Sequence, residues 1–476
     1  MNKLRKTKIV ATIGPASDSP EVLKEMIAAG MNVARLNLSH GSYDYHQTLL
    51  NLIRDTAETM SIPVAIMVDT RGIEVRTGKL EGSSVELVSG EEFILYTDGR
   101  IGTRLGVSVT YRNLPAEVCP QTPILLDDGA IELEVTSISN DSIICQVIHG
   151  GVLLENKSVN LPDTELTISA VSPEYRDDIV REITFAADNQ VDYLAASFVQ
   201  NAEDIHRIRE IFLETDRLIP IIAKIENKAG MRHLEEIVGA ADGIMVARGD
   251  LGVELPLAEV PVFQKKIIRT TVMNGKPVIT ATEMLASMER NPKPTRAEAS
   301  DVANAILDGT SAVMLSGETA VGKFPVQAVR TMSILAQRTE ASLREYGYLQ
   351  KIHMDPVNII PEVVSQSAVK MADQLNAAAI FSLTETGFTS RLVSKNRPDC
   401  PILAVTYTKL VVRRLCMNWG VMPMLYEGGN DDKAKLDFAL NRAKELGYIR
   451  SGDVVVVTAG YQQQAGSTDL IRVLTV

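Results

Sequence analysis

Apolar runs of strand length that end in polar residues recur along the chain. Eight of them stand out, at 8–13, 33–39, 64–70, 191–197, 219–226, 244–250, 278–282 and 312–316. Helical signals lie between most neighbouring runs, as where Ser19-Pro20 predicts the start of a helix and Gly30 its end. Continuous apolar strands that alternate with helices indicate a parallel sheet covered by helices. Eight such units in succession favour a closed (β/α)8 TIM barrel over the alternative, two smaller doubly wound domains.

One long interval interrupts this alternation, between Thr70 and the strand that begins near Val191. Short alternating runs fill it at 84–88, 92–96, 107–111, 124–126, 131–135 and 143–148, separated by Gly, Asp and Asn. That pattern is typical of a small all-β domain. We therefore expect a β-rich lid domain at 71–167, inserted into a barrel formed by 1–70 and 168–346. The barrel helices should resume at Ser172-Pro173, a second Ser-Pro cap.

A second alternation follows the predicted long helix at 325–346. Helical segments are expected at 361–375, 389–395, 409–417 and 433–446, and apolar strands at 378–383, 402–405, 421–425 and 454–457. This order predicts a three-layer α/β C-terminal domain at 347–476.

Composition narrows the function. The 476 residues carry 48 Lys and Arg against 60 Asp and Glu, a net charge of −12, with no dense basic patch, so we expect no nucleic-acid partner. Four cysteines without a CxxC pair indicate a reducing cytoplasm, and no signal-peptide core or membrane-spanning run is found. The net negative charge does not exclude binding of small anionic ligands, which a few basic residues in a cleft could hold.

Candidate chemistry gathers at the carboxyl ends of the strands. Side chains alternate along a strand, so Arg35, Asn37 and Ser39 share one face. The same alternation pairs Lys224 with Glu226, Arg248 with Asp250 and Thr280 with Thr282, and Asp69-Thr70 ends another strand. Polar residues at the end of any one strand can simply mark where the chain enters solvent. Five strands that end in this way favour an active site, because barrel active sites are assembled from the carboxyl ends of the strands.

These groups suit phosphoryl transfer, which needs positioning and charge neutralisation more than a nucleophile. Glu226 and Asp250 match the two carboxylates that Mg²⁺ takes beside phosphate oxygens. Arg35 and Arg76 suit forked contacts to phosphate or carboxylate, and Lys224 supplies a compact charge. The oxygens of a further set suit a monovalent cation: Asn37, Ser39, Asp69 and Thr70.

No GxSxG, HExxH or dinucleotide GxGxxG motif is present. The segment 317–323 resembles a P-loop, since it follows a strand and precedes a helix. It has Phe324 where a Ser or Thr would bind Mg²⁺, and we interpret it as a chance match.

Several long motifs resemble pyruvate kinase over essentially the whole chain. They lie at 6–10 with 12–15, 35–41, 224–227, 245–254, 291–292 with 294–298, and 301–309 with 313–318. The resemblance implies a barrel with a lid after its third strand and a C-terminal regulatory domain. It also implies the last step of glycolysis, transfer of phosphate from phosphoenolpyruvate to ADP with Mg²⁺ (or Mn²⁺) and K⁺, usually in a homotetramer.

The resemblance also assigns roles residue by residue. Lys224 matches the charge that stabilises the transferring phosphoryl group, and a proton reaches the enolate through water near Thr282, with Ser316 and Glu318 as neighbours. Implied substrate contacts are Arg35, Lys224, Gly249, Asp250 and Thr282; Mg²⁺ ligands are Glu226 and Asp250; K⁺ ligands are Asn37, Ser39, Asp69 and Thr70; nucleotide contacts are Asn37, Leu38, Ser39, His40 and Arg76.

The chain departs from the family at a few positions. The usual Lys-Gly-Pro-Glu reads Arg71-Gly72-Ile73-Glu74, where Glu74 resembles K⁺-dependent members, and Glu283 replaces a usual Gln. Glu174 stands where a nucleotide-binding Lys is common, so it either weakens phosphate binding or only favours the start of a helix.

Two further questions stay open at this stage. The loop 384–390 resembles a site for the phosphate of a sugar-phosphate effector, although an ordinary helix cap would look similar. The alternatives to the enzyme are a Mg²⁺-dependent lyase barrel acting on phosphoenolpyruvate or pyruvate, and a related sensor that has lost turnover.

Overall fold

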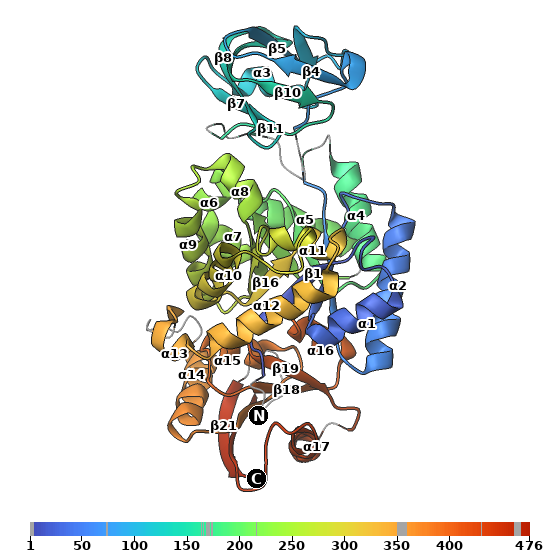
Figure 1. Cartoon of the computed structure of the whole chain (residues 1–476). Coiled ribbons are helices and arrows are strands. Elements are labelled where there is room, and N and C mark those ends of the chain that lie inside the picture. Colours follow the sequence, from blue (N-terminus) through green and yellow to red (C-terminus); the bar gives the residue numbers. More distant parts are fainter. Residues whose placement is uncertain are drawn as a thin grey trace.

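The structure is a computed structural model that describes residues 4–72, 75–162, 164, 166–167, 172, 175–215, 217–349, 359–429, 431–460 and 468–476. Eight parallel strands close into a barrel at the centre of the molecule (Figure 1). They are β1 (Lys8–Thr12), β2 (Val33–Asn37), β3 (Ala65–Asp69), β12 (Tyr193–Ala196), β13 (Ile221–Ile225), β14 (Gly243–Ala247), β15 (Val278–Ala281) and β16 (Ala312–Leu315). The predicted (β/α)8 barrel is confirmed, and the alternative of two doubly wound domains is wrong.

Helices surround the barrel, and local signals set their ends. They are α1 (Pro20–Ala29), α2 (Tyr43–Met60), α4 (Arg176–Asp188), α5 (Ala202–Glu214), α6 (Lys228–Arg232), α7 (Leu234–Ala240), α8 (Arg248–Glu254), α9 (Val260–Met273), α10 (Arg296–Asp308), α11 (Gly317–Ala320), α12 (Pro325–Glu340) and α13 (Leu343–Tyr346). Ser19 accepts a hydrogen bond from the Val22 amide at 3.3 Å, and Gly30 ends α1 with a left-handed φ of 117°, as predicted.

Two predicted helix bounds are wrong. The helix that follows the insertion begins at Arg176 with Tyr175 at its N-cap, later than Ser172; Pro173 lies outside the described residues. The long helix expected at 325–346 is two helices, α12 and α13, because Ala341 and Ser342 form a turn between them.

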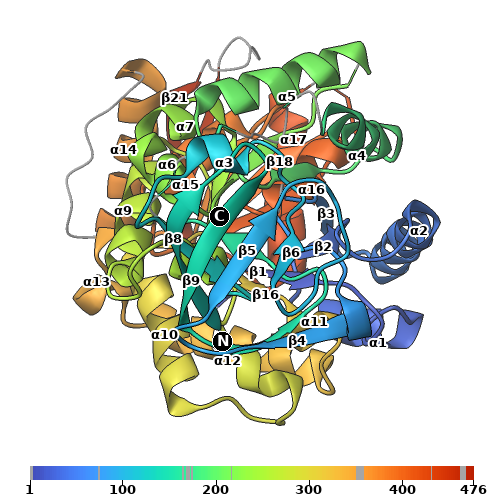
Figure 2. The same ribbon diagram turned by 90° about the horizontal axis from the view of Figure 1, so that it is seen from above.

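The lid domain lies over one end of the barrel (Figures 1 and 2). Its elements are η1 (Glu81–Ser83), β4 (Ser84–Leu87), β5 (Glu92–Tyr96), β6 (Gly106–Ser108), α3 (Leu114–Glu117), β7 (Pro123–Leu126), β8 (Ile131–Ile138), β9 (Ser142–His149), β10 (Gly151–Leu154) and β11 (Val159–Asn160). They form a six-stranded sheet, β11-β7-β8-β9-β5-β6, and a two-stranded ribbon, β10-β4. The small β-rich domain is confirmed, although β10 and β11 were not predicted.

The C-terminal domain lies at the other end of the barrel (Figure 1). Its elements are α14 (Ile359–Gln374), β17 (Ala379–Leu383), α15 (Phe388–Lys395), β18 (Ile402–Thr406), α16 (Lys409–Leu415), β19 (Val421–Leu425), α17 (Asp432–Glu445), β20 (Val454–Gly460) and β21 (Thr468–Thr475). The sheet order is β19-β18-β17-β20-β21, with β21 antiparallel to β20. One apolar cluster packs α17 on the sheet and another packs α14, which gives the three predicted layers.

The C-terminal domain closes the floor of the barrel. Met417, fully buried, belongs to the apolar cluster inside the barrel together with Met67 and Met245. The Lys8 ammonium of β1 donates a 2.6 Å hydrogen bond to the Val421 carbonyl of β19. Among the described helices, none is long and apolar enough to cross a membrane.

Candidate functional site

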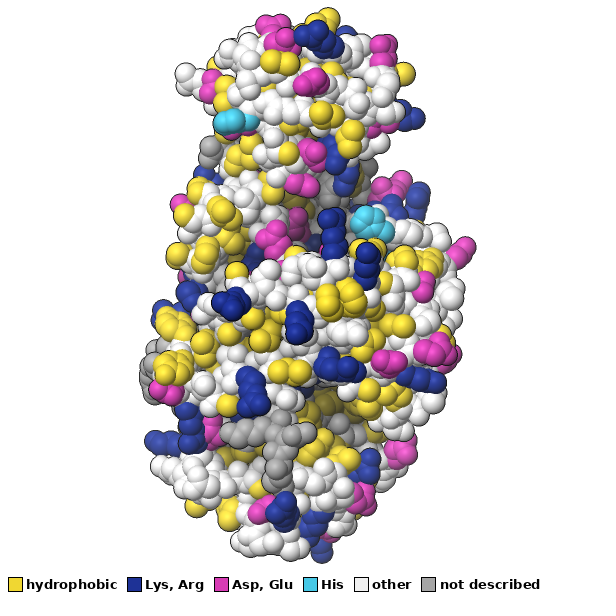
Figure 3. Space-filling view, in the orientation of Figure 1, with side chains coloured by type: hydrophobic (Ala, Val, Ile, Leu, Met, Phe, Trp, Pro, Cys, Tyr) yellow, Lys and Arg dark blue, Asp and Glu magenta, His cyan; other side chains and the backbone are white. Residues whose placement is uncertain are grey.

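A pocket of about 830 Å³ lies where the carboxyl ends of the barrel strands face the lid domain. Figure 3 shows acidic, basic and histidine side chains gathered where the lid meets the barrel. The lid contributes Arg76 and β11, while α4 and α8 form parts of the wall. The volume lies in the usual range for small-molecule sites.

Most of the sequence-predicted site residues meet here. Those that line the pocket are Arg35, Asn37, Ser39, His40, Thr70, Arg76, Lys224, Glu226 and Asp250. Asp69 is fully buried directly behind them, in contact with Arg35 and Lys224. Leu38, Gly249 and Thr282 do not line the pocket, although Leu38 is adjacent in sequence to residues that do.

A chain of ion pairs crosses the pocket floor. Lys224 Nζ lies 3.1 Å from Asp69 Oδ1 and 2.8 Å from Glu226 Oε1, and Arg35 Nε lies 2.6 Å from Asp69 Oδ2. Burial opposes ionisation of Asp69, but the charges of Arg35 and Lys224 outweigh it and lower the pKa of this carboxyl. Burial also opposes the charge on Lys224, yet Asp69 and Glu226 raise its pKa. The floor therefore holds a fixed, charged ammonium.

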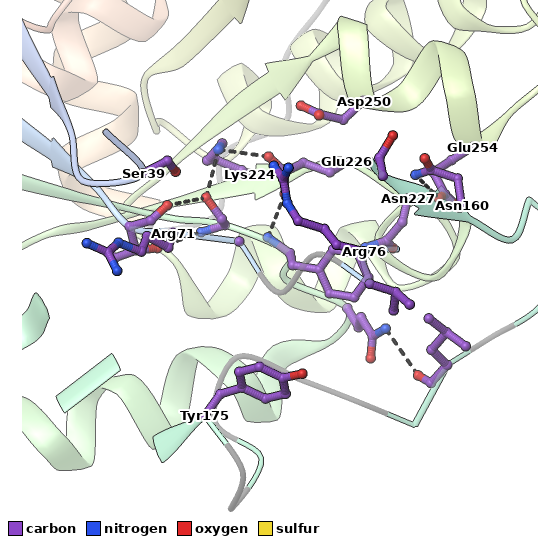
Figure 4. Close-up of a pocket in the computed structure, with 18 of the residues that line it drawn as sticks. Ser39, Arg71, Arg76, Asn160, Tyr175, Lys224, Glu226, Asn227, Asp250 and Glu254 are labelled. Atoms are coloured by element: carbon purple, nitrogen blue, oxygen red, sulfur yellow. Dashed lines mark hydrogen bonds and ion pairs between the residues drawn. The ribbon is translucent and has the colours of Figure 1, made fainter. Parts of the chain in front are cut away.

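Two carboxylates stand beside this ammonium. Glu226 and Asp250 both line the pocket, and Figure 4 shows Lys224 and Glu226 turned toward each other with Asp250 nearby. Burial raises the pKa of Glu226 to about 7, and the charge of Asp250 adds to the shift. Among the described residues no group of three or more His, Cys, Asp or Glu forms a ready metal cage. Two carboxylates with room for substrate oxygens fit the ligand preference of Mg²⁺.

The oxygens predicted for a monovalent cation lie at the ends of β2 and β3. Asn37 Oδ1 accepts a hydrogen bond from the Ser39 amide at 3.2 Å, and Thr70 Oγ1 accepts one from the Ser197 amide at 3.1 Å. Asp69 already has a cation on each oxygen, and these oxygens together carry one formal negative charge. The donor set fits a weakly bound monovalent ion.

Strand alternation pairs Arg248 with Asp250, but only Asp250 lines the pocket. β14 ends at Ala247, so Arg248 and Asp250 lie on α8 and the alternation of a strand does not apply. Arg248 points away from the pocket and binds the Asp301 carboxylate at 2.6 Å and the Thr282 carbonyl at 2.7 Å. It therefore holds the loop after β15 in place.

Gly249 and Thr282 form a contact of their own. The Gly249 amide donates to Thr282 Oγ1 at 2.7 Å. Thr282 and Glu283 both adopt left-handed backbone, with φ of 64° and 54°, which costs energy in residues other than Gly and is common at functional sites. Glu283 is exposed. Glu318 is buried, and it accepts hydrogen bonds from the Leu285 and Ser316 amides.

Three further residues that were not predicted from the sequence also line the pocket: Ser197, Glu182 and Asn160. Ser197 Oγ accepts from Lys224 Nζ at 2.7 Å and donates to the Thr70 carbonyl at 2.8 Å. Ser197 ends a predicted strand run, so the same strand-end signal identifies it. Asn160 carries no such signal, since it reaches the pocket only through packing of the lid against α8. Ile73, Glu74 and Glu174 lie outside the described residues.

In the C-terminal domain, some polar groups of the loop 384–390 are already hydrogen-bonded within the protein. Thr384 Oγ1 accepts a hydrogen bond from the Gly387 amide at 3.0 Å, and the Thr389 and Thr468 hydroxyls are 2.7 Å apart. Gly387 has a φ of 83°. Gly387 is the N-cap of α15 and, among the described residues, no side chain caps that helix, so the expected effector site stays a hypothesis.

Residues 4–329 match the family described as "Pyruvate kinase, barrel domain", and residues 362–474 match "Pyruvate kinase, alpha/beta domain". "Pyruvate kinase" of Geobacillus stearothermophilus is 46% identical over 473 residues, covering 98% of this chain and 80% of that protein. "Pyruvate kinase 2" of Synechocystis sp. is 46% identical over 475 residues, covering 98% and 79%. "Pyruvate kinase" of Clostridium acetobutylicum is 40% identical over 476 residues, covering 99% and 100%.

Proposed function

Because the chain belongs to the pyruvate kinase family of phosphotransferases, we propose that it transfers the phosphoryl group of phosphoenolpyruvate to ADP, giving pyruvate and ATP. The observation that carries the proposal is Lys224, held between Asp69 and Glu226 on the floor of a pocket large enough for both substrates. Phosphoryl transfer needs such fixed charge at the oxygens of the moving group, because negative charge must be neutralised there.

In this proposal Lys224 stabilises the transferring phosphoryl group. Arg35, oriented by its 2.6 Å contact with Asp69, binds the anionic end of phosphoenolpyruvate. Thr282 is the candidate for guiding the proton that the enolate of pyruvate must gain, and its amide partner Gly249 fixes its hydroxyl. Asp69 holds both cations in place and, apart from its proposed contact with K⁺, takes no part in the transfer.

Glu226 and Asp250 would hold Mg²⁺ or Mn²⁺, and Asn37, Ser39, Asp69 and Thr70 would hold K⁺. A bound divalent ion supplies positive charge at the phosphoryl oxygens of both substrates. The raised pKa of Glu226 supports this assignment, because a cation beside a buried carboxylate offsets the cost of its charge.

The nucleotide would lie along the segment 37–40, with Arg76 of the lid domain on its phosphates. Asn37, Ser39 and His40 line the same pocket as Arg76. Closure of the lid over the pocket would exclude water from the transfer step. We also propose that the protein catalyses the last step of glycolysis in the cytoplasm, as a homotetramer. A sugar-phosphate effector would bind at 384–390. The proposed domain limits are 1–70 with 168–346 for the barrel, 71–167 for the lid domain and 347–476 for the C-terminal domain.

A pyruvate-release assay with phosphoenolpyruvate, ADP, Mg²⁺ and K⁺ tests the proposed reaction. We expect pyruvate and ATP in equal amounts, a loss of rate without Mg²⁺, and a lower rate when Na⁺ replaces K⁺. The assay repeated with GDP reports the nucleotide preference. Absence of pyruvate, with sugar phosphates supplied, would favour the sensor without turnover, whereas phosphoenolpyruvate consumption that does not depend on a nucleoside diphosphate would favour the lyase.

A further inference from the structure

Glu182 is a buried acid in the pocket wall that the proposed chemistry does not use. It lies on α4, is 2% exposed and lines the pocket. Its Oε2 accepts a hydrogen bond from the Arg71 amide at 3.1 Å, and its Oε1 lies 3.6 Å from Arg71 Nε. Burial raises the pKa of Glu182 to about 7, although Arg71 favours the charged form. A buried carboxylate is costly, so the contact with Arg71 must offset part of that cost.

Arg71 connects Glu182 to the segment 37–40. It is the second residue after β3, where the chain leaves the barrel for the lid domain. Its Nε also donates a 2.7 Å hydrogen bond to the Leu38 carbonyl. Leu38 belongs to the segment 37–40, which is folded back on itself by hydrogen bonds from the Ser39 and His40 amides to Asn37.

We propose that Glu182 is a positioning residue for the nucleotide. Through Arg71 it fixes the segment 37–40, and the residues 70–72 where the chain leaves for the lid domain, against α4. This inference rests on the proposed function, which places the nucleotide on that segment. Glu182 acts on the protein and does not touch the reacting atoms. The phosphoenolpyruvate side of the pocket, built on Lys224 and its partners Asp69, Ser197 and Glu226, has no hydrogen bond or ion pair to Glu182 among the described residues.

The charge of Glu182 should matter as well as its shape. Arg71 stands in the same pocket as Arg35 and Arg76, and its side chain is 49% exposed at the pocket edge. If the Glu182 carboxylate is removed, two effects favour movement of the Arg71 guanidinium away from Leu38. These are repulsion from the other two cations and hydration of the guanidinium by solvent. Figure 4 shows Arg71 on the side of the pocket where Ser39 lies. A displaced Arg71 would therefore release the segment that bears Ser39.

The test compares the full-length protein with Glu182→Gln, Glu182→Asp and Arg71→Lys, and uses Asp188→Asn, an exposed acid at the far end of α4, as the matched control. Calorimetry measures binding of Mg²⁺-ADP and of phosphoenolpyruvate, and steady-state rates give KM for each. For Glu182→Gln we expect KM and Kd for ADP to rise about tenfold, because Gln can still accept from the Arg71 amide but lacks the negative charge that faces the Arg71 guanidinium. The values for phosphoenolpyruvate should stay within about twofold, and Glu182→Asp should recover part of the ADP affinity.

Equal losses for both substrates, or unchanged ADP binding, would overturn the inference and leave Glu182 a purely structural residue. Hydrogen exchange of the protein without ligands keeps this test separate from the proposed reaction. Peptides that cover 37–42 and 70–72 should exchange faster in Glu182→Gln than in Asp188→Asn, even if the wild-type protein releases no pyruvate. Unchanged exchange there would contradict the positioning role. If Glu182→Gln fails to fold, the same measurements on Glu182→Asp and Arg71→Lys test the positioning role.

Discussion

Asp69 shows how one buried side chain can set the charge of a whole site. It has no exposed surface, yet it stays ionised because Arg35 and Lys224 each contact one of its oxygens. Removal of one partner of such a group leaves uncompensated buried charge, which is far more costly than any exposed ion pair. The orientation of both cations therefore depends on a fully buried residue behind the pocket wall.

Lys8 is also a buried cation, but its ammonium donates to a backbone carbonyl, that of Val421, instead of to a carboxylate. Burial lowers the pKa of Lys8 from 10.5 to about 8. The unfolded chain then binds more protons than the folded one between about pH 8 and pH 10.5, so the free energy of unfolding rises with pH in that window, by about 3 kcal/mol. We therefore expect the difference between the thermal unfolding midpoints, wild type minus Lys8→Met, to increase from pH 8 to pH 10. Lys24→Met, at an exposed lysine of α1, should show no such difference, and parallel pH profiles for Lys8→Met and wild type would contradict this account.

Much of the site was predictable at the residue scale, because strand ends are visible in sequence. Lys224, Glu226 and Asn37 lie where alternation along a strand places them. Arg248 was not predictable from alternation, since β14 ends one residue earlier and a helix turns the side chain toward Asp301. Glu182 carried no usable signal, because its role depends on a tertiary contact with Arg71.

At the scale of elements, the lid domain is tied to the barrel by its returning strand as well as its outgoing one. Asn160 of β11 donates a 3.0 Å hydrogen bond to Glu254 at the end of α8, and Figure 4 shows the two side by side. Burial raises the pKa of Glu254. Asp250 lies one turn earlier on the same helix, so the position of the lid is linked to a proposed metal ligand.

Asn160→Ala should loosen this link, because it removes a hydrogen-bond donor from the half-buried Glu254 carboxylate, a loss of about 1–2 kcal/mol. We expect faster hydrogen exchange in peptides covering 158–162 and a higher KM for ADP. Gln146→Ala, at an exposed position of β9 in the same domain, serves as the control. Exchange in 158–162 that matches the control would show that the contact does not hold the lid.

The elements that sequence patterns missed bury little apolar surface. β21 runs along the edge of the C-terminal sheet with Leu470 and Val473 40% and 43% exposed, so it lacks the apolar run that marks the barrel strands. β11 is only two residues long. The barrel strands, buried on both faces, were predictable because a closed parallel sheet needs a continuous apolar sequence.

At the scale of the whole molecule, the C-terminal domain completes the barrel in addition to any regulatory role. Met417 fills the barrel interior from below, and the Tyr193 hydroxyl donates a 2.5 Å hydrogen bond to the Arg414 carbonyl next to it. The two domains thus share a core. A movement of α16 would therefore displace the side chains that fill the barrel interior beneath the pocket.

Met417→Ala should test this shared core, because a cavity at a fully buried methionine costs about 2–5 kcal/mol. We expect a lower unfolding midpoint by scanning calorimetry, with barrel and C-terminal domain affected together. Met371→Ala, at a methionine of α14 that is 40% exposed, should change the midpoint little. A midpoint for Met417→Ala equal to that of Met371→Ala would show that the floor of the barrel is not packed as described.

The central claim is that Lys224 drives phosphoryl transfer in this pocket. The most direct measurement is pyruvate release by Lys224→Gln beside wild type and Lys266→Gln, a change at an exposed lysine of α9, with phosphoenolpyruvate binding measured in parallel. We expect wild type and Lys266→Gln to release pyruvate, and folded Lys224→Gln to bind phosphoenolpyruvate but turn over about 10³-fold more slowly. A rate for Lys224→Gln within about tenfold of wild type, or no pyruvate from the wild type, would contradict the claim.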